Sequence, residues 1–346
     1  MKDKSSSFPL HPHNYTSPMQ PVTVIATVLN EVQDIARLVP SLLAQTPPAA
    51  EIVIVDGGST DGTWEWLVEA ARSHPTLHPI RDEFCNLKHC PGPVSRGRNV
   101  AIAAANSQII ACADAGCTYA RDWLASITAP IAASTAKYAL GGARLDLTDP
   151  TLWDIASAPF LGVKLSPSAD SKSCTARSMA FTKDLWKRIG GFPESVLLGD
   201  DTHFDIEARR LTPPAFVQSA KAIYRPQNTL SSASRQLARY STSDGVLGVR
   251  AARLFRNAFR CVLQVLALLA LPLFALPWSI LPLVLVFAMQ CWLAFHPDWR
   301  IIRNAGPRTL LARFLFSALV PWIIAINHTR GLITKKEPGN RQNQQP

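Results

Sequence analysis

Several common sequence features are absent from this 346-residue chain. The first twenty residues contain no apolar run of the kind that forms the core of a signal peptide, so we expect a flexible tail there. The seven cysteines have no disulfide-like spacing, and Cys85, His89 and Cys90 are not followed by a second pair of metal ligands. These absences favour a reducing compartment and argue against a zinc site.

Charged residues are absent from residues 261–295, which contain no Lys, Arg, Asp or Glu. The whole chain nevertheless has a formal net charge of +10, and much of the excess follows Arg235. Basic residues beside long apolar segments favour contact with an anionic membrane surface. The chain has no nucleic-acid-binding motif and no interleaving of aromatic and basic residues, so we expect no nucleic-acid partner.

The stretch Glu51–Thr63, which reads EIVIVDGGSTDGT, organises the first part of the chain. Its β-branched run Ile52–Val55 is typical of a central parallel strand with both faces covered. Two glycines allow a sharp turn after Asp56, and the pattern from Thr63 to Ala71 predicts a helix. The Asp56 carboxylate would then lie at the carboxyl end of a parallel strand, where open α/β sheets bind ligands. The alternative is an ordinary strand–turn–helix corner with a capping aspartate.

Two further strands are predicted to end near acidic residues. One is Val22–Leu29, followed by Glu31 and a helix over Val32–Ala44; the other lies in residues 108–117 and contains Asp114. The β-α-β-α order predicts a parallel sheet with right-handed crossovers. Three carboxylates gathered at one sheet edge need compensation. A hard divalent ion such as Mg²⁺ or Mn²⁺ would supply it at Asp114.

Two arginines, Arg96 and Arg98, immediately precede a helix predicted over Asn99–Ala105. A helix N-terminus with nearby arginines suits an anionic group such as a phosphate. The alternative is that these arginines are solvated surface residues. A dinucleotide-dependent oxidoreductase is disfavoured, because no G-x-G-x-x-G follows the first strand.

The chain resembles the family-2 nucleotide-sugar glycosyltransferases of the bacterial membrane-anchored type, from about Pro21 to Gly245. The resemblance rests on the order and spacing of VIATVLNE, IVIVDGGSTDGT, SRGRNVAI, ADAGC, SMAF, GGFPE and GDDT. It implies the α/β GT-A fold, a Rossmann-like and mostly parallel sheet with helices on both faces. It also implies an enzyme of the hexosyltransferase type that uses a nucleotide-sugar donor.

The resemblance also assigns residues to the donor site. These are Thr27, Glu31, Asp56, Arg98, Asp114, Arg235, Gln236 and Arg239. Asp114 would be the first acid of the family's D-x-D metal motif and would bind a divalent metal, Mg or Mn. The second acid of that motif is replaced here by Gly116, which should weaken metal binding because fewer charged ligands remain.

By the same resemblance, Asp201 would be the catalytic base that removes the proton of the acceptor hydroxyl as it attacks the anomeric carbon. The neighbouring Asp200 could instead cap a helix predicted over residues 203–210. The family's Q-x-x-R-W element is matched in the segment RQLARY, with Tyr240 in place of Trp. Arg235 and Arg239 lie one helical turn apart there and could clamp a diphosphate, or could belong to a basic interfacial helix.

The apolar residues 261–295 are too long for one straight membrane span and are interrupted by prolines. They predict a tight helical hairpin, about 261–277 and 279–295. Arginines at both ends would then lie on the same cytoplasmic side. A third apolar segment, about 310–327, could span the membrane, re-enter it or lie at its surface.

These expectations give one organisation and one function. The parts are a disordered tail (1–20), a GT-A domain (21–245), an amphipathic and transmembrane region (246–334) and a second disordered tail (335–346). We expect a membrane-anchored inverting glycosyltransferase at the inner (cytoplasmic) membrane, with its catalytic domain in the cytoplasm. It would move a sugar from a nucleotide-diphosphate sugar to a hydroxyl of a lipid-linked or cell-surface glycan. The alternative is a non-catalytic, membrane-associated nucleotide-sugar-binding protein.

Overall fold

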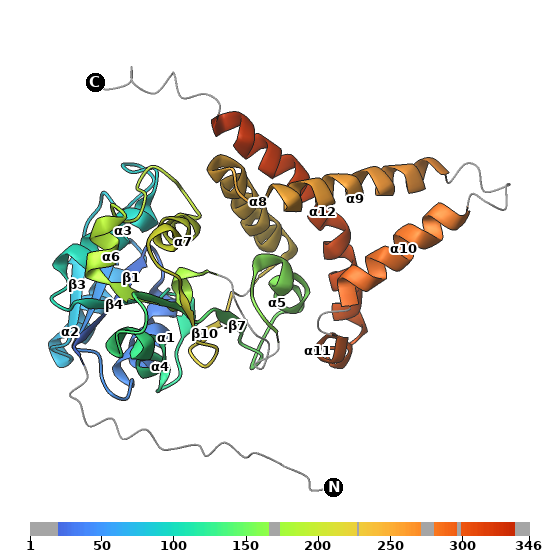
Figure 1. Cartoon of the computed structure of the whole chain (residues 1–346). Helices are drawn as coiled ribbons and strands as arrows, with labels where there is room; N and C mark the ends of the chain where they lie inside the picture. The colour runs from blue at the N-terminus through green and yellow to red at the C-terminus, as the bar shows by residue number, and fades with distance from the viewer. Residues whose placement is uncertain (1–19, 166–173, 227, 271–279, 296–298, 336–346) are drawn as a thin grey trace, which may run out of the picture.

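The computed structural model describes residues 20–165, 174–226, 228–270, 280–295 and 299–335. An α/β unit occupies one side of the molecule, and long helices from the last third of the chain occupy the other (Figure 1). The tails expected at 1–20 and 335–346 fall almost wholly outside the described residues, since only residue 20 and the helical Lys335 are described.

The order of elements along the chain agrees with the predicted β-α-β-α opening. The strands are β1 (Val22–Val28), β2 (Glu51–Asp56), β3 (Leu77–Arg81), β4 (Ile109–Cys112), β5 (Cys117–Thr118), β6 (Tyr138–Leu140), β7 (Ala143–Leu145), β8 (Met179–Thr182), β9 (Ala215–Phe216) and β10 (Ala222–Tyr224). The α-helices are α1 (Val32–Leu43), α2 (Thr63–Ser73), α3 (Pro93–Ala104), α4 (Trp123–Ala132), α5 (Leu152–Ser157), α6 (Lys183–Arg188), α7 (Asp200–Leu211), α8 (Leu230–Leu247), α9 (Ala251–Ala270), α10 (Ile280–Phe295), α11 (Trp299–Asn304) and α12 (Pro307–Lys335). Two short 3₁₀ helices are η1 (Ala158–Leu161) and η2 (Ala176–Ser178).

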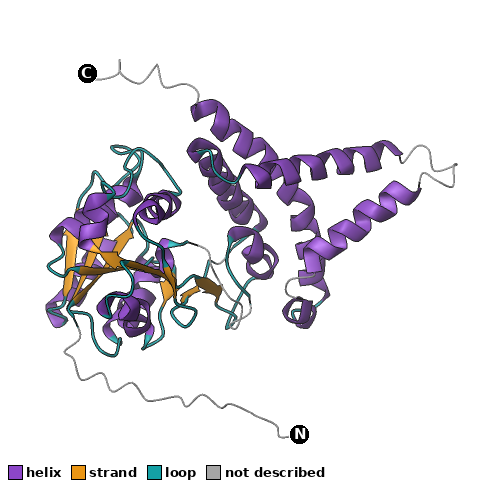
Figure 2. Cartoon of the chain, in the orientation of Figure 1, coloured by secondary structure: helices purple, strands orange, loops and turns teal. Residues whose placement is uncertain are grey.

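The main sheet has seven strands in the order β3-β2-β1-β4-β8-β6-β9. It is mostly parallel, because only β8 runs antiparallel to its neighbours β4 and β6. A smaller sheet joins β5, β10 and β7. Both sheets lie within the α/β unit (Figure 2).

Helices cover both faces of the main sheet, as the sequence predicts. Alternate residues of a strand point to opposite faces, so on β1 Val24 packs into one core and Ile25 into the other. The first core is closed by α1, α2 and α4, through residues such as Leu38. The second is closed by α3, α6 and α7, where Phe204 stacks on Phe192. The GT-A type of sheet is therefore confirmed.

Two local expectations are wrong. The helix predicted to begin at Asn99 begins six residues earlier, because Pro93 occupies its first turn, and Arg96 and Arg98 therefore lie within α3. Asp200 does not cap α7 from outside, since Gly199 is the N-cap in a left-handed conformation (φ 81°) and Asp200 is the first helical residue.

The long helix α12 packs against the α/β unit as well as against α8. Gly331 of α12 and Gly245 of α8 meet at the crossing, where a Cβ on Gly331 would lie 2.1 Å from the Thr242 carbonyl oxygen. Arg313 of α12 is fully buried and donates to the carbonyl oxygens of Ile155 (3.1 Å) and Ala156 (3.2 Å) in α5. Nearby, α12 contributes to a core that also contains residues of α8 and η1.

The predicted hairpin over residues 261–295 corresponds to α9 and α10. The first limb begins ten residues earlier than expected, because the arginine-rich residues after Ala251 continue the same helix. The two helices spread apart from their joined ends and both contact α12, so they form an open V rather than a tight pair (Figure 1). Residues 271–279, which include the predicted turn at Pro277, lie outside the described part of the chain.

Within the described residues, one helix is long and apolar enough to cross a membrane: Pro307–Thr334, within α12. Of its most apolar stretch, 44% is buried against the rest of the protein, which is also typical of a core helix. Large apolar side chains are exposed on the helices of this region. They include Phe255, Phe259, Val262, Leu266, Phe287, Leu311, Leu315 and Ile326.

Candidate functional site

A cavity of about 820 Å³ lies where the carboxyl ends of β1 and β4 meet α7, α8, α9 and α12. Five of the predicted site residues line it: Thr27, Glu31, Arg98, Asp114 and Asp201. The ends of β1 and β4, the starts of α1 and α7, and helix α3, which carries Arg98, bring these residues together from distant parts of the sequence. The sheet edge therefore holds a site at the position expected for an open α/β fold.

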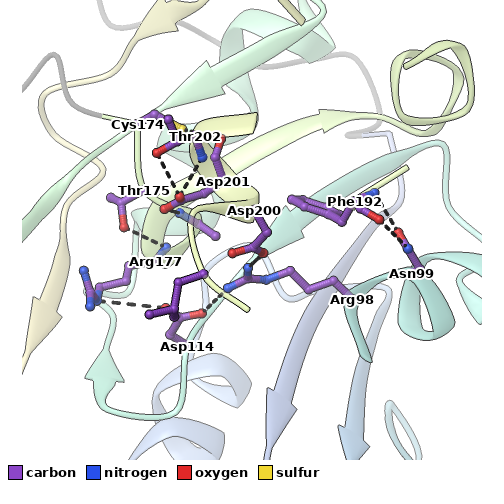
Figure 3. Close-up of polar contacts among 12 residues, drawn as sticks. Arg98, Asn99, Asp114, Cys174, Thr175, Arg177, Phe192, Asp200, Asp201 and Thr202 are labelled. Carbon is purple, nitrogen blue, oxygen red and sulfur yellow. Dashed lines mark hydrogen bonds and ion pairs between the residues drawn. The ribbon is translucent and has the colours of Figure 1, made fainter. Parts of the chain in front are cut away.

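Arg98 connects the acids at the sheet end of this cavity. The residue is 5% exposed, and its guanidinium group donates to Asp114 Oδ1 at 2.9 Å and also to Asp200 (Figure 3). The ring of Phe192 lies 5.6 Å from the guanidinium carbon. Both sides of the cation are thus engaged by carboxylates, and Arg98 holds two acids of the cavity in fixed positions.

Asp201 lies beside this cluster at the start of α7. One carboxylate oxygen accepts from the Thr202 N–H (2.6 Å) and the other from the Ala176 N–H (3.3 Å) (Figure 3). Burial raises the pKa of the Asp201 carboxyl, the Asp200 carboxylate raises it further, and Arg98 opposes both effects. A carboxylate with a raised pKa is a stronger base, and this one faces the cavity.

Asp114 follows β4 in the turn that leads to β5. Its N–H donates to the Tyr119 hydroxyl (3.1 Å), which in turn donates to the Arg177 carbonyl oxygen (2.7 Å). At Gly116, where a second acid was expected, an added Cβ would come within 3.2 Å of the Tyr224 ring. An acidic residue there would require the Tyr224 ring to shift by a few tenths of an ångström.

The Asp114 carboxylate fits a metal ion whose other ligands come from a substrate and from water. Among the described residues no three His, Cys, Asp or Glu side chains gather in a ligand cluster. Mg²⁺ is commonly held by one or two carboxylates together with substrate phosphates and water. Asp114 could serve as the single protein carboxylate in such a set.

Arg177 occupies the space next to Asp114 and was not found by sequence reasoning. Its guanidinium group lies 3.9 Å from Asp114 Oδ2, donates to the Tyr240 hydroxyl at 3.0 Å and stacks 4.3 Å from the centre of the Tyr224 ring. The only signal in the sequence is one arginine ahead of the buried strand that begins at Met179. Arg177 places a positive charge on the Tyr224 ring, the same ring that Gly116 approaches.

Glu31 forms the start of α1 without capping it. It occupies the N-cap position, but its side chain accepts no capping hydrogen bond and instead lines the cavity. Burial, with contributions from Asp34 and Asp114, raises the pKa of Glu31 to about 8. Its carboxyl group is therefore largely protonated at neutral pH and can donate a hydrogen bond to a ligand.

Asp56 lies at the predicted place in the fold, but its carboxylate points into its own turn. It is fully buried and accepts from the N–H groups of Gly58 (3.1 Å) and Ser59 (3.0 Å) and from the Ser59 hydroxyl. It is not among the residues that line the cavity. The predicted contact between Asp56 and a nucleotide stays a prediction, and the structural role of the carboxylate is to fix the turn.

The three residues predicted on α8 also lie outside the cavity lining. Arg235 and Arg239 are exposed. Gln236 donates to the Tyr240 hydroxyl at 3.0 Å and so supports the contact between Tyr240 and Arg177. The structure therefore places the cavity cations elsewhere than on the predicted pair: they are Arg98, Arg177, Arg225, Arg250 and three arginines in the first turns of α9.

Comparison with known proteins gives a matching family, a curated relative and many solved structures of similar fold. The sequence profile of Glycosyl transferase family 2 matches residues 23–212. Glycosyltransferase AglE of Haloferax volcanii is 24% identical over 194 residues, which are 55% of this chain. The match spans 61% of the length of that curated relative.

Among solved structures, the mannosyltransferase PcManGT of Pyrobaculum calidifontis, in complex with GDP-Man and Mn²⁺, is similar with a TM-score of 0.50 and 19% identity. The similarity covers 93% of this chain and 77% of that one. Residues 1–349 of S. aureus TarS give a TM-score of 0.44 and 17% identity, over 92% of each chain. The likeness to PcManGT extends beyond the α/β unit into the helical region.

Proposed function

This chain belongs to glycosyl transferase family 2, and from that premise we propose that it is a membrane-anchored inverting glycosyltransferase. It would transfer a sugar from a nucleoside diphosphate sugar to a hydroxyl group of a lipid-linked acceptor. One observation carries the proposal: a basic carboxylate, Asp201, and an arginine-held carboxylate, Asp114, line the same cavity at the sheet edge.

The donor would bind at the sheet end of the cavity. Thr27 and the protonated Glu31 would contact the nucleotide, and Arg177 would lie against the diphosphate. We propose a supporting role for Arg98, because its two carboxylate partners already engage it. Direct donor contacts by Asp56 and by Arg235, Gln236 and Arg239 would require rearrangement of the turn after β2 and of α8.

The reaction would be a single displacement. Asp201 would accept the proton of the acceptor hydroxyl while the oxygen forms a bond to the anomeric carbon, and the bond from that carbon to the nucleoside diphosphate would break. Attack from the side opposite the leaving group inverts the anomeric configuration. Arg177 would stabilise the negative charge that develops on the diphosphate.

A divalent metal, Mg²⁺ or Mn²⁺, is proposed at Asp114. PcManGT, which shares the fold, was solved with GDP-Man and Mn²⁺. Such an ion would neutralise the diphosphate and so assist its departure. Asp114 would hold it with one carboxylate, because Gly116 supplies no second ligand.

We propose that the protein is anchored at the inner (cytoplasmic) membrane, with residues 21–245 in the cytoplasm and 246–334 in contact with lipid. The exposed apolar side chains of α9, α10 and α12 support the anchoring, and so does the apolar length of α12. The packing of α12 against α8 and α5 would then tie the catalytic unit directly to its anchor. The alternative is a non-catalytic nucleotide-sugar-binding protein. One observation favours it: Gly116 replaces the second acid of the metal motif.

The test uses the purified full chain and a panel of nucleotide sugars that starts with GDP-mannose, with Mn²⁺ present. Release of free nucleoside diphosphate, stimulated by a membrane lipid extract, is the expected result. Asp201→Asn should bind the same donor without releasing product. Donor binding by the parent without release or transfer under any of these conditions would favour the non-catalytic alternative.

A further inference from the structure

A row of arginines lines the second end of the cavity. Arg253, Arg256 and Arg260 follow one another at intervals of three and four residues on α9, so they share one face of the helix. Arg250 immediately precedes the helix, and all four line the cavity that also contains Asp201. These four residues are called the α9 arginine row.

The row is only partly neutralised. Asp244 of α8 pairs with Arg250 (2.7 Å) and Arg253 (3.0 Å). Across the described part of the chain, Arg256 and Arg260 form no ion pair, and Arg260 contacts the Asn257 side chain at 3.3 Å instead. Four guanidinium groups thus face one carboxylate in a concave site, which attracts an anion.

The row lies close to the proposed reaction centre. Asp244 follows Tyr240 by one helical turn, a rise of about 5–6 Å, and Tyr240 accepts a hydrogen bond from Arg177 at the donor end. On the same turn, Ser243 donates to the Leu198 carbonyl oxygen in the loop that leads into α7. A ligand on the row would therefore share one cavity with the catalytic base.

The other side of α9 is apolar and exposed. Phe255, Phe259, Val262 and Leu266 recur at intervals of four, three and four residues, and each is more than half exposed. A helix with one such face and a basic opposite face lies at the boundary between lipid and water. The row would then face the cavity at the depth of lipid head groups.

From these placements we propose that the α9 arginine row binds the phosphate or diphosphate group through which the acceptor is attached to its lipid. The ligand class is an amphiphile with an apolar chain esterified to phosphate or diphosphate. Its anion would contact Arg256 and Arg260, and its sugar hydroxyl would reach Asp201. This inference rests on the proposed function, because it names the acceptor of the same reaction.

The test compares two double variants of the full chain in nanodiscs of neutral phosphatidylcholine. R256Q/R260Q removes the two charges of the row that have no carboxylate partner. R303Q/R308Q removes two exposed arginines of α11 and α12 that do not line the cavity, and so makes the same change in net charge. Binding of decyl diphosphate is measured by calorimetry against empty nanodiscs, with inorganic pyrophosphate as competitor.

The parent should bind decyl diphosphate, and pyrophosphate alone should compete poorly because it lacks the chain. R256Q/R260Q should weaken this binding about 10- to 100-fold, the usual effect of losing charge-assisted contacts, and R303Q/R308Q should leave it unchanged. Donor nucleotide binding should remain at the parent's level in both. Equal loss in the two variants would mean that the anionic ligand is attracted by the overall positive charge of the protein, and it would overturn the proposal.

Two further outcomes separate this inference from the proposed function. If the parent binds a nucleoside diphosphate but not decyl diphosphate, or if R256Q/R260Q loses nucleotide binding, the row is not an acceptor site and the inference fails alone. If the parent binds neither ligand under conditions in which its circular dichroism spectrum shows a folded protein, the proposed function fails as well.

Discussion

The two ends of the central cavity hold their arginines in opposite ways. At the sheet end, Arg98 is buried between Asp114 and Asp200, and Arg177 is fixed by Tyr240 and the Tyr224 ring. At the α9 end, four arginines face one carboxylate. In the first arrangement both arginines already have protein partners before any ligand binds, whereas the second has excess positive charge.

This difference indicates two different tasks. A cluster whose arginines already have protein partners can orient a base and a diphosphate with little rearrangement, which is what preorganised catalytic sites do. An unbalanced row is suited to capture a diffusing anion. The following predictions test that division, and they are ordered from the largest expected effect to the smallest.

The largest effect is expected at the base. Asp201→Asn keeps the size of the side chain and the acceptor for the Thr202 N–H, but it removes the basicity. The value of kcat should fall by about 10²–10⁴ while donor binding is nearly unchanged. Glu207→Gln changes an acid on the same helix that does not line the cavity, and it should retain activity. Near-parental kcat in Asp201→Asn would show that another group is the base.

The next effect concerns the metal. Asp114→Asn retains an oxygen near Arg98 but lacks the negative charge that a hard cation requires. Stimulation of nucleotide binding by Mn²⁺ should fall about 10- to 100-fold in calorimetry. Nucleotide binding without metal should change little. If the nucleotide affinity of the parent does not respond to Mn²⁺, the proposed metal site at Asp114 is contradicted.

The junction between the α/β unit and the helical region can be disturbed directly. In Gly331→Ala the new methyl group would meet the Thr242 carbonyl oxygen, so α12 would have to move away from α8. Overpacking of this kind costs about 1–3 kcal/mol, which exceeds the benefit of alanine in a helix. The free energy of unfolding should fall by that amount. Ile333→Val, at an exposed position on the same helix, is the control and should have little effect.

A smaller effect is expected from the group that positions Arg177. Tyr240→Phe removes the hydroxyl that contacts Arg177 and Gln236, so kcat should fall about 3- to 10-fold. Tyr138→Phe removes a hydroxyl that contacts Asp205 outside the cavity lining, and it should leave kcat unchanged. The same loss in both variants would indicate a general effect on folding.

The smallest effect is a shift of the pH profile. The base must be ionised, and burial raises the pKa of Asp201 above the ordinary aspartate value of about 4. Activity should therefore fall, as the pH is lowered, at a higher pH than for an ordinary aspartate. The profile of kcat/KM is measured where circular dichroism shows the folded protein. Loss of activity only at or below pH ~4 would contradict a raised pKa.

The sequence predicted the sheet because the pattern at each strand depends on local chemistry. Continuous β-branched runs such as Ile52–Val55 are buried on both faces wherever they occur in a parallel sheet. The sheet also brings Glu31, Asp114 and Asp201 to one cavity, as the motifs imply. The boundaries of the elements are harder to predict from the sequence. The start of α3, for example, is set by Pro93 in its first turn.

The remaining parts of the site depend on side-chain direction and on helix packing, which local sequence does not determine. The local sequence leaves open whether Asp56 faces a ligand or caps its own turn, and in the structure its carboxylate turns back onto Ser59. Arg177 acquires its position from Tyr224 and Tyr240, which are distant in the sequence. The cavity end formed by α9 depends on the packing of α9 against α12 and on its ion pair with Asp244 of α8.

The central claim is that one cavity binds the donor at the sheet end and the lipid phosphate at the α9 end, with Asp201 between them. The most direct measurement is a crystal structure of the full chain with Mn²⁺, decyl diphosphate and the nucleoside diphosphate that binds best in calorimetry. The account predicts the nucleotide beside Asp114 and Arg177, and a separate anion on Arg256 and Arg260. A nucleotide diphosphate bound on the α9 arginine row, or both anions at one end, would contradict it.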